Sequence, residues 1–246
     1  MVNIQVREMT FTDIEAIIFD KDGTLQDSRD FLRSLALRRS RFIDSKIPGV
    51  GEPLSMAFGV EAHDLNPTGL MAVGSRRENE IAAAAYIAET GVGWLESNTI
   101  ARQAFDEADE WLKKDTVPPA LFPGSLEVLK SLHQAGVKLG ILSADSPEAV
   151  NQFVQYYQLS PYLQLQMGVE GDLTKPDPAL FLQGCDRLGV TPSVTLMVGD
   201  SPGDMQMAAT AGAAGCIGIC DRAIADAFKK ADVVITKLDD IQIRSL

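Results

Sequence analysis

The feature that most constrains the fold is an apolar run that ends in two carboxylates. Residues 16–25 read Ala-Ile-Ile-Phe-Asp-Lys-Asp-Gly-Thr-Leu, so the apolar stretch leads directly into Asp20 and Asp22. Unpaired carboxylates inside a sheet would cost free energy or shift their pKa. At the carboxyl end of a strand in an open α/β sheet they are well placed, because such folds bind ligands at that edge. The run predicts two aspartates that hold a hard cation, one of which attacks an electrophile, although a simple turn at a strand end would give the same letters.

Short apolar segments alternate with helical patterns along the second half of the chain. This alternation predicts a parallel sheet with helices on both faces, an α/β, Rossmann-like core. The expected strands are 14–20, 138–142, 165–168, 194–198, 215–219 and 231–235. The expected helices of this core are 124–135, 147–157, 178–188, 202–211 and 223–230.

A block without strand patterns interrupts the core after its first strand. The apolar spacing predicts a helix over 27–46, capped by Asp27 or Ser28, and helical structure throughout 47–114, including 78–90 and 98–114. The Thr-Val-Pro-Pro segment 116–119 is typical of a linker. We therefore expect residues 1–25 and 116–246 to form the core, and residues 26–115 to form an inserted all-helical cap domain.

Composition narrows the class of partner. The 246 residues carry a formal net charge of −12, which argues against nucleic acid or an anionic membrane as a partner. A phosphate ester can still bind if a metal and a few cations reverse the field locally. We find no signal peptide and no apolar run long enough to span a membrane, so we expect a cytoplasmic protein, either a monomer or a homodimer.

Three further strand ends carry chemistry that complements the first. The strand at 138–142 is followed by Ser143 and Ala144, whose hydroxyl and backbone N–H can donate to a phosphoryl oxygen, although serine is also a common helix cap. Lys175 is held between a turn and a proline, where a solvated surface lysine is the alternative. The strand at 194–198 ends in Gly-Asp-Ser-Pro-Gly-Asp, which places Asp200 and Asp204 as metal ligands. Asp204 also fits a first-turn helix residue stabilised by the helix dipole.

The four motifs, in this order, resemble those of the haloacid dehalogenase-like (HAD) hydrolase superfamily. These are Asp-x-Asp-x-Thr, a strand ending in Ser or Thr, Lys-Pro-x-Pro, and Gly-Asp-x-x-x-Asp. A cap between the first and second motifs is similar to the helical-cap subgroup, which includes phosphoglycolate phosphatases and β-phosphoglucomutases. The dehalogenases of this superfamily lack the second aspartate of the first motif, so Asp22 favours phosphoryl transfer.

The resemblance implies a mechanism and a cofactor. Asp20 would attack phosphorus and form an aspartyl-phosphate, and Asp22 would serve as general acid and then as general base. The cofactor would be Mg²⁺, with the side chains of Asp20 and Asp200 and the backbone carbonyl of Asp22 as ligands and Asp204 as a ligand or supporting partner. The positive and donor groups for the transferring phosphoryl would be Lys175, Ser143 and the amide of Ala144.

The cap contains one candidate for substrate recognition. Its Gly-Ser-Arg-Arg run resembles a specificity loop, in which Arg76 or Arg77 would reach a substrate carboxylate, phosphate or hydroxyl. The alternative is that both arginines pair with Glu78 and Glu80. We expect a Mg²⁺-dependent phosphatase that acts on a small, phosphoglycolate-like ester. The competing functions are a β-phosphoglucomutase-like isomerase and a catalytically silent binding or regulatory module.

Overall fold

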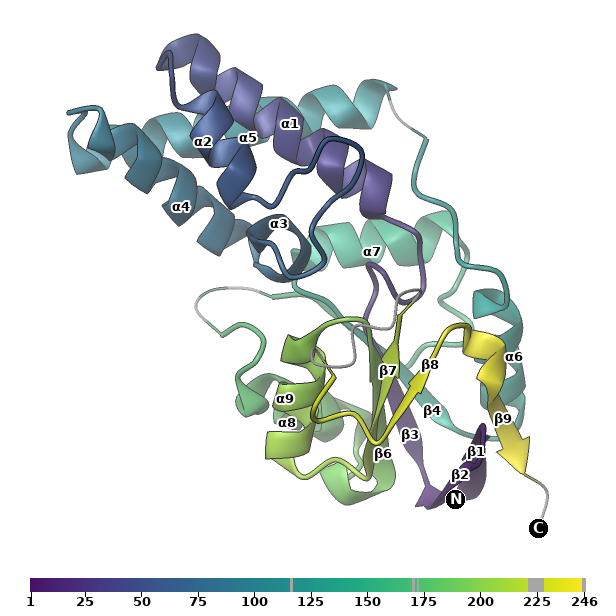
Figure 1. Cartoon of the computed structure of the whole chain (residues 1–246). Coiled ribbons are helices and arrows are strands. Elements are labelled where there is room, and N and C mark those ends of the chain that lie inside the picture. The colour runs from purple at the N-terminus through teal and green to yellow at the C-terminus, as the bar shows by residue number, and fades with distance from the viewer. Residues whose placement is uncertain (116, 170, 172, 221–227, 245–246) are drawn as a thin grey trace. The chain divides into compact units, whose positions relative to one another are not determined.

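The computed structural model describes residues 1–115, 117–169, 171, 173–220 and 228–244. The chain forms two compact units (Figure 1). One unit consists of Met1–Asp27 together with Ala120–Leu246, and the other is the inserted segment Ser28–Pro119. Each unit has a hydrophobic core of its own.

The first unit is built on a six-stranded parallel sheet, which confirms the predicted α/β fold. The strand order is β5-β4-β3-β6-β7-β8, so the first strand of the sheet along the chain, β3, lies in the middle. The strands are β3 (Ala16–Phe19), β4 (Lys138–Leu142), β5 (Leu165–Met167), β6 (Thr195–Gly199), β7 (Gly215–Ile219) and β8 (Val233–Ile235). Because β3 lies between β4 and β6, the segments that follow these three strands come together at one edge of the sheet.

Side chains of the central strand alternate between two cores. Ile17 and Phe19 pack with α6 (Ser125–Gln134) and α7 (Pro147–Tyr156) on one face. Ala16 and Ile18 pack on the opposite face with α8 (Pro178–Leu188) and α9 (Pro202–Ala211). All four residues of β3 are buried, which explains the continuous apolar run in the sequence.

A second, antiparallel sheet was missing from the sequence prediction. It has the order β2-β1-β9, formed by β1 (Val2–Val6), β2 (Met9–Ile14) and β9 (Ile241–Arg244). The predicted strand 14–20 is therefore too long at its start, because Ile14 pairs with Val2 in this sheet. Phe11 of β2 packs directly over Gly215 of β7, so the small sheet contributes to the core of the large one.

Two further predictions concern the segment 223–235. The expected strand 231–235 is shorter, since β8 begins at Val233. The expected helix 223–230 falls mostly on residues 223–227, which lie outside the described residues, and 228–230 form a turn.

The inserted unit is helical but not throughout. Its helices are α1 (Arg29–Lys46), α2 (Gly51–Ala57), α3 (Leu70–Val73), α4 (Arg76–Glu89) and α5 (Trp94–Asp115). The prediction of helix across 47–114 is wrong for residues 58–69, which form turns and an isolated bridge between Val60 and Leu65. Gly59, with φ 84°, and Pro67 break the helical pattern there.

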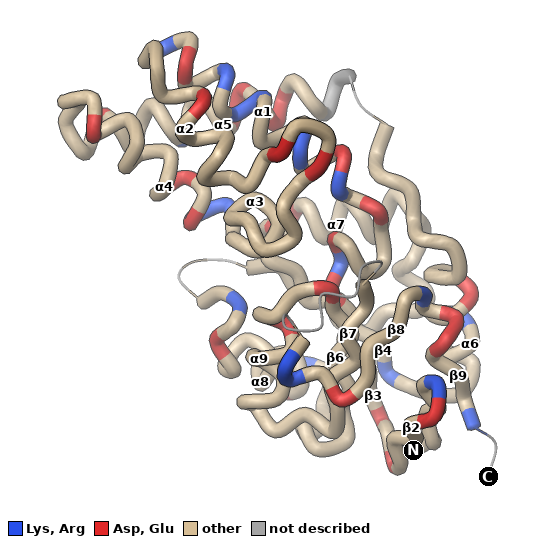
Figure 2. The backbone as a smooth tube through the Cα atoms, in the orientation of Figure 1, with Lys and Arg blue, Asp and Glu red and all other residues tan. Residues whose placement is uncertain are grey.

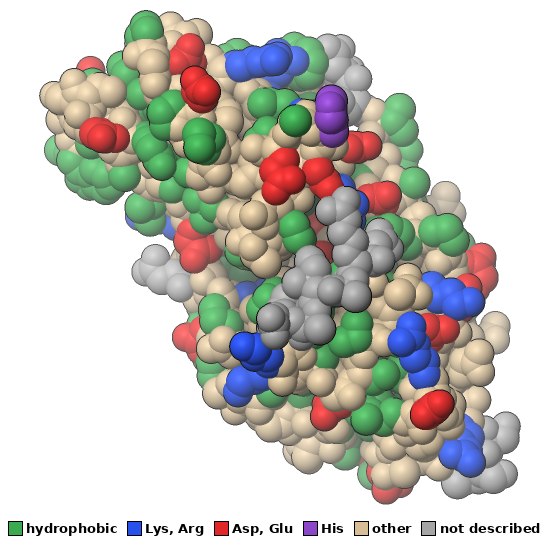
Figure 3. Space-filling model, in the orientation of Figure 1, with side chains coloured by type: hydrophobic (Ala, Val, Ile, Leu, Met, Phe, Trp, Pro, Cys, Tyr) green, Lys and Arg blue, Asp and Glu red, His purple; other side chains and the backbone are tan. Residues whose placement is uncertain are grey.

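The surface of the inserted unit mixes both signs of charge. Figure 2 shows acidic and basic residues interspersed along its helices, and Figure 3 shows hydrophobic side chains scattered among them on the visible face. Among the described residues, none of the helices combines the length and apolarity needed to cross a membrane.

Candidate active site

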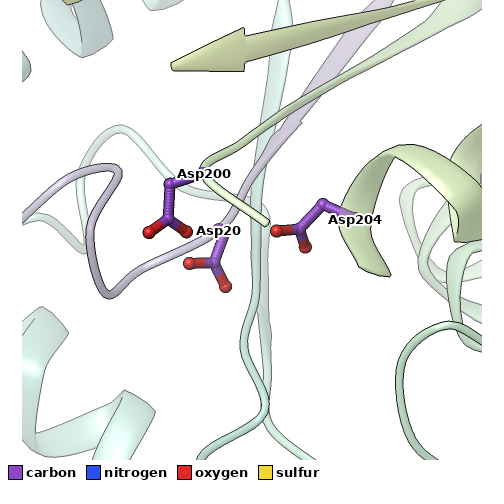
Figure 4. A group of neighbouring side chains, drawn as sticks. All are labelled: Asp20, Asp200 and Asp204. Atoms are coloured by element: carbon purple, nitrogen blue, oxygen red, sulfur yellow. The ribbon is translucent and has the colours of Figure 1, made fainter. Parts of the chain in front are cut away.

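The parallel strands β3 and β6 bring Asp20 and Asp200 together. β3 and β6 run parallel, with Phe19 opposite Val198, and the backbone N–H of Asp20 donates to the carbonyl of Val198 at 2.8 Å. Asp20 and Asp200 therefore emerge side by side at the same edge (Figure 4). Asp204, on the first turn of α9, points toward them, and one carboxylate oxygen from each of the three lies within 4.8 Å of the others.

Lys175 neutralises part of this acidic cluster. Its ammonium pairs with Oδ1 of Asp20 and lies 2.7 Å from Oδ1 of Asp204. Burial works to lower the pKa of Lys175, but Asp20 and Asp204 outweigh it, and the net shift is upward. The lysine is thus a buried, permanently charged partner of Asp20.

The other oxygen of Asp204 has a structural role. Oδ2 accepts hydrogen bonds from the hydroxyl of Ser201 at 2.6 Å and from its backbone N–H at 3.2 Å. Ser201 and Asp204 form the capping box of α9. Both oxygens of Asp204 are therefore engaged, one by Lys175 and one by the helix cap.

The cluster is short of positive charge. Burial is the largest cause that raises the pKa of Asp20, which reaches about 7; Lys175 opposes the rise, while Asp204 and Asp22 add to it. The pKa of Asp200 is also raised well above its usual value, first by burial and then by Asp20 and Asp204. Asp20 and Asp204 are buried and Asp200 is partly buried, and such incompletely neutralised carboxylate oxygens are the donor set that suits Mg²⁺. The residues present therefore fit a divalent metal.

A glycine makes room for this arrangement. Gly23 has φ 74°, and a Cβ atom on it would lie only 1.9 Å from Oδ2 of Asp200. The Asp200 carboxylate thus rests directly against the backbone of the turn that follows β3. No other residue would permit both this backbone conformation and this close approach.

Asp22 lies on the same turn but has different partners. Its Oδ1 accepts from Nε2 of Gln26 at 2.7 Å, and its Oδ2 pairs with the ammonium of Lys21. Lys21 also pairs with Oδ2 of Asp145 at 2.9 Å. The pairing of Lys21 with Asp145 could not be predicted from the sequence, because Asp145 is remote in the chain.

Ser143 and Ala144 follow β4, the neighbour of β3 on the other side. Ser143 is buried. Its backbone N–H donates to the carbonyl of Met167 at 3.0 Å, and its Oγ accepts from the N–H of Asp145 at 3.2 Å. Since Phe19 lies opposite Ile141, Ser143 and Asp20 both lie beyond the carboxyl ends of paired strands. The proton of the Ser143 hydroxyl can be donated to a ligand there.

Arg76 and Arg77, the two arginines expected to recognise substrate, both belong to the inserted unit. Arg76 pairs with Glu80 at 2.7 Å, with Asp106 at 2.5 Å, and with Asp109. Arg77 is exposed. Glu78 does not pair with them in the expected way, because its carboxylate accepts from the N–H and hydroxyl of Ser75 in the capping box of α4.

Comparison with known proteins decides the family. A family model described as haloacid dehalogenase-like hydrolase matches residues 14–212. The chain belongs to the haloacid dehalogenase-like hydrolases. This confirms the resemblance drawn from the four motifs and establishes the chain as an enzyme of the hydrolase class.

Curated relatives of this hydrolase are phosphatases. It is 29% identical over 210 residues to a phosphoglycolate phosphatase of Vibrio vulnificus (strain YJ016), covering 84% of each chain. It is 27% identical over 205 residues to a candidate pyrophosphatase of Clostridium perfringens (strain 13 / Type A), covering 82% of this chain and 83% of the relative.

Solved structures share the fold of this HAD hydrolase. The crystal structure of a predicted phosphoglycolate phosphatase from Haemophilus somnus 129PT matches with a TM-score of 0.70 at 21% identity, covering 93% of this chain and 96% of that one. β-Phosphoglucomutase from Clostridium difficile matches with a TM-score of 0.62 at 20% identity, covering 92% of each chain.

The raised carboxyl pKa values predict a pH-dependent response to Mg²⁺. Between the ordinary aspartate pKa and about 7, the folded metal-free protein holds a proton on the Asp20–Asp200 pair that the unfolded chain releases. The free energy of unfolding should therefore fall as pH rises through this window, by up to about 1.4 kcal/mol per pH unit. Mg²⁺ should raise the melting temperature more at about pH 8 than at about pH 5.5, because protons compete for its ligands. Thermal melts with EDTA or Mg²⁺ test this, and equal increases at both pH values would contradict it.

Substitution of Gly23 should damage the metal site specifically. In Gly23→Ala the new methyl group must displace the Asp200 carboxylate, so Mg²⁺ affinity measured by titration calorimetry should fall by at least about tenfold. Gly203→Ala is the matched control, because a Cβ atom there would lie 3.5 Å from the Ser201 hydroxyl and 3.6 Å from Lys175, which are ordinary contacts. Equal Mg²⁺ affinity in the two variants would show that Asp200 is not a ligand.

Proposed function

We propose that this HAD hydrolase is a Mg²⁺-dependent phosphatase that cleaves a small phosphorylated metabolite through an aspartyl-phosphate on Asp20. The observation that carries the proposal is the buried cluster at the edge of the parallel sheet, in which Lys175 joins Asp20 to Asp204 and Asp200 lies alongside. Such a cluster combines a nucleophile with groups that neutralise a phosphoryl oxygen.

Asp20 is the residue best placed to attack phosphorus. Its backbone is fixed by the hydrogen bond to Val198, and its Oδ1 is held by Lys175. The second carboxylate oxygen then has a defined direction in which to form the bond to phosphorus. Lys175, with its raised pKa, stays charged and offsets the negative charge of the attacked phosphoryl group.

Asp22 is proposed to protonate the leaving oxygen and later to take a proton from the hydrolytic water. It lies two residues after the nucleophile, and both of its carboxylate oxygens are fixed, by Gln26 and Lys21. The Ser143 hydroxyl and the amide of Ala144 would donate to the non-bridging oxygens from the end of β4.

The residues proposed to hold Mg²⁺ are the side chains of Asp20 and Asp200 and the backbone carbonyl of Asp22. The metal would supply charge neutralisation and orientation of the phosphoryl group. For Asp204, the contacts of both oxygens favour a supporting role, in which it fixes Lys175 and caps α9.

For the substrate, we propose a small phosphoglycolate-like monoester. The support is the similarity to phosphoglycolate phosphatases over most of both chains. The inserted unit, Ser28–Pro119, is proposed as the cap that recognises the rest of the substrate. The contacts of Arg76 with three carboxylates favour a structural role within that unit, which leaves Arg77 as the arginine better suited to substrate.

Release of inorganic phosphate from a panel of metabolite esters tests this function. The panel should include phosphoglycolate, sugar phosphates and pyrophosphate, each with Mg²⁺ and with EDTA. We expect Mg²⁺-dependent release, and a loss of at least about a thousandfold in kcat in Asp20→Asn, because the nucleophile is removed. Asp186→Asn, an exposed carboxylate of α8, is the matched control and should retain full activity.

Other outcomes point to the competing functions. Isomerisation of a sugar phosphate without phosphate release would indicate a mutase. Full activity in Asp20→Asn would refute the proposed nucleophile. A folded protein that neither releases phosphate nor isomerises any ester would indicate a catalytically silent module.

A further inference from the structure

Lys21 is a buried cation that neither attacks phosphorus nor transfers a proton in the proposed chemistry. Lys21 stands between Asp20 and Asp22 in the chain, and its side chain is only 5% exposed. It pairs with Asp22 and, at 2.9 Å, with Asp145, and it lies 5.6 Å from the ring centre of Phe153 on α7.

The partners of Lys21 belong to different parts of the site. Asp22 is on the turn after β3, whereas Asp145 is on the loop between β4 and α7. That loop carries Ser143, whose Oγ accepts from the N–H of Asp145 at 3.2 Å, and the carbonyl of Asp145 accepts from Val169 at 2.8 Å. The Lys21 ammonium is thus a direct link between the turn of Asp22 and the loop of Ser143.

The backbone of Lys21 also shapes the Asp22 turn. Its carbonyl accepts from the N–H groups of Leu25 at 2.9 Å and Gln26 at 3.1 Å. Gln26 in turn donates to the carboxylate oxygen of Asp22 that Lys21 does not pair with. The Asp22 carboxylate is partly buried, and because both of its oxygens are held it has little rotational freedom, which is what a proton-transferring group needs.

We propose that Lys21 is a positioning residue, which fixes the Asp22 carboxylate for proton transfer and couples it to the Ser143 loop. The proposal rests on the acid–base role proposed above for Asp22. Two buried lysines then have separate tasks: Lys175 serves the nucleophile, and Lys21 serves the acid–base group.

Lys21→Met tests this proposal. It removes the ammonium and keeps an apolar stem against Phe153. The readout is kcat/KM for two esters: the best alkyl phosphate of the panel, and p-nitrophenyl phosphate, whose leaving group departs without a proton. We expect kcat/KM to fall by at least about tenfold for the alkyl ester and by at most about threefold for the aryl ester, because only the former needs the acid.

Lys138→Met is the matched control. Lys138 is a half-buried lysine at the start of β4, and its ammonium donates to the carbonyls of Leu188 at 2.8 Å and Gly189 at 3.3 Å. It makes a comparable number of polar contacts at the opposite end of the strand from Ser143. Its substitution should leave the ratio of the two kcat/KM values unchanged.

Two further variants keep the test decisive. In an Asp22→Asn background, Lys21→Met should lower the alkyl-ester rate by less than about twofold, since the group it positions is gone. If Lys21→Met does not fold, Asp145→Ala removes the half-exposed partner of the same ammonium and should show a weaker loss with the same preference for the aryl ester.

Failure of the two proposals can be told apart. Absence of phosphate release by the wild-type enzyme would refute the proposed function. If the wild type is active and Asp22→Asn discriminates between the esters, but Lys21→Met lowers both equally or acts undiminished in the Asp22→Asn background, then the positioning role alone is refuted.

Discussion

Asp20 is buried and Asp200 lies partly buried beside it, and the free energy cost of that juxtaposition shapes the rest of the site. Parallel strands β3 and β6 end at the same level, so their terminal carboxylates meet. Lys175 offsets one charge, and Asp204, anchored by Ser201, keeps Lys175 in place. Burial, together with the negative charge that remains, raises the pKa values of Asp20 and Asp200, and the same carboxylate oxygens could hold a divalent cation. The ion pairs of the site and the proposed chemistry thus share one electrostatic cause.

The parallel sheet and the residues at the ends of its strands could be predicted from the sequence, because each strand and the motif that follows it are adjacent in the chain. The apolar run before Asp20 marks a strand buried on both faces, and Ser143 and Asp200 each directly follow an apolar strand of their own. The rule that carboxyl ends of parallel strands share an edge then brings Asp20, Ser143 and Asp200 together without knowledge of any distance. The family comparison agrees with the family predicted from the four motifs.

What could not be predicted depends on contacts between remote residues. The pairing of Lys21 with Asp145 requires the register of β3 and β4. The three carboxylates around Arg76 include two from α5, so only Glu80, four residues away on the same helix, was visible as a partner. The small sheet could not be predicted because β1 and β9 lie far apart in the sequence. These short strands are stabilised by pairing with each other and by the packing of Phe11 into the core of the large sheet.

Trapping the covalent intermediate tests the central claim most directly. The enzyme would be mixed rapidly with Mg²⁺ and its best ester, quenched in acid, and mapped by peptide mass spectrometry. The account predicts a phosphoryl group on the peptide that contains residues 16–25, localised to Asp20 and absent from Asp20→Asn. Turnover with a phosphoryl group on a different residue, or a label that persists in Asp20→Asn, would contradict it.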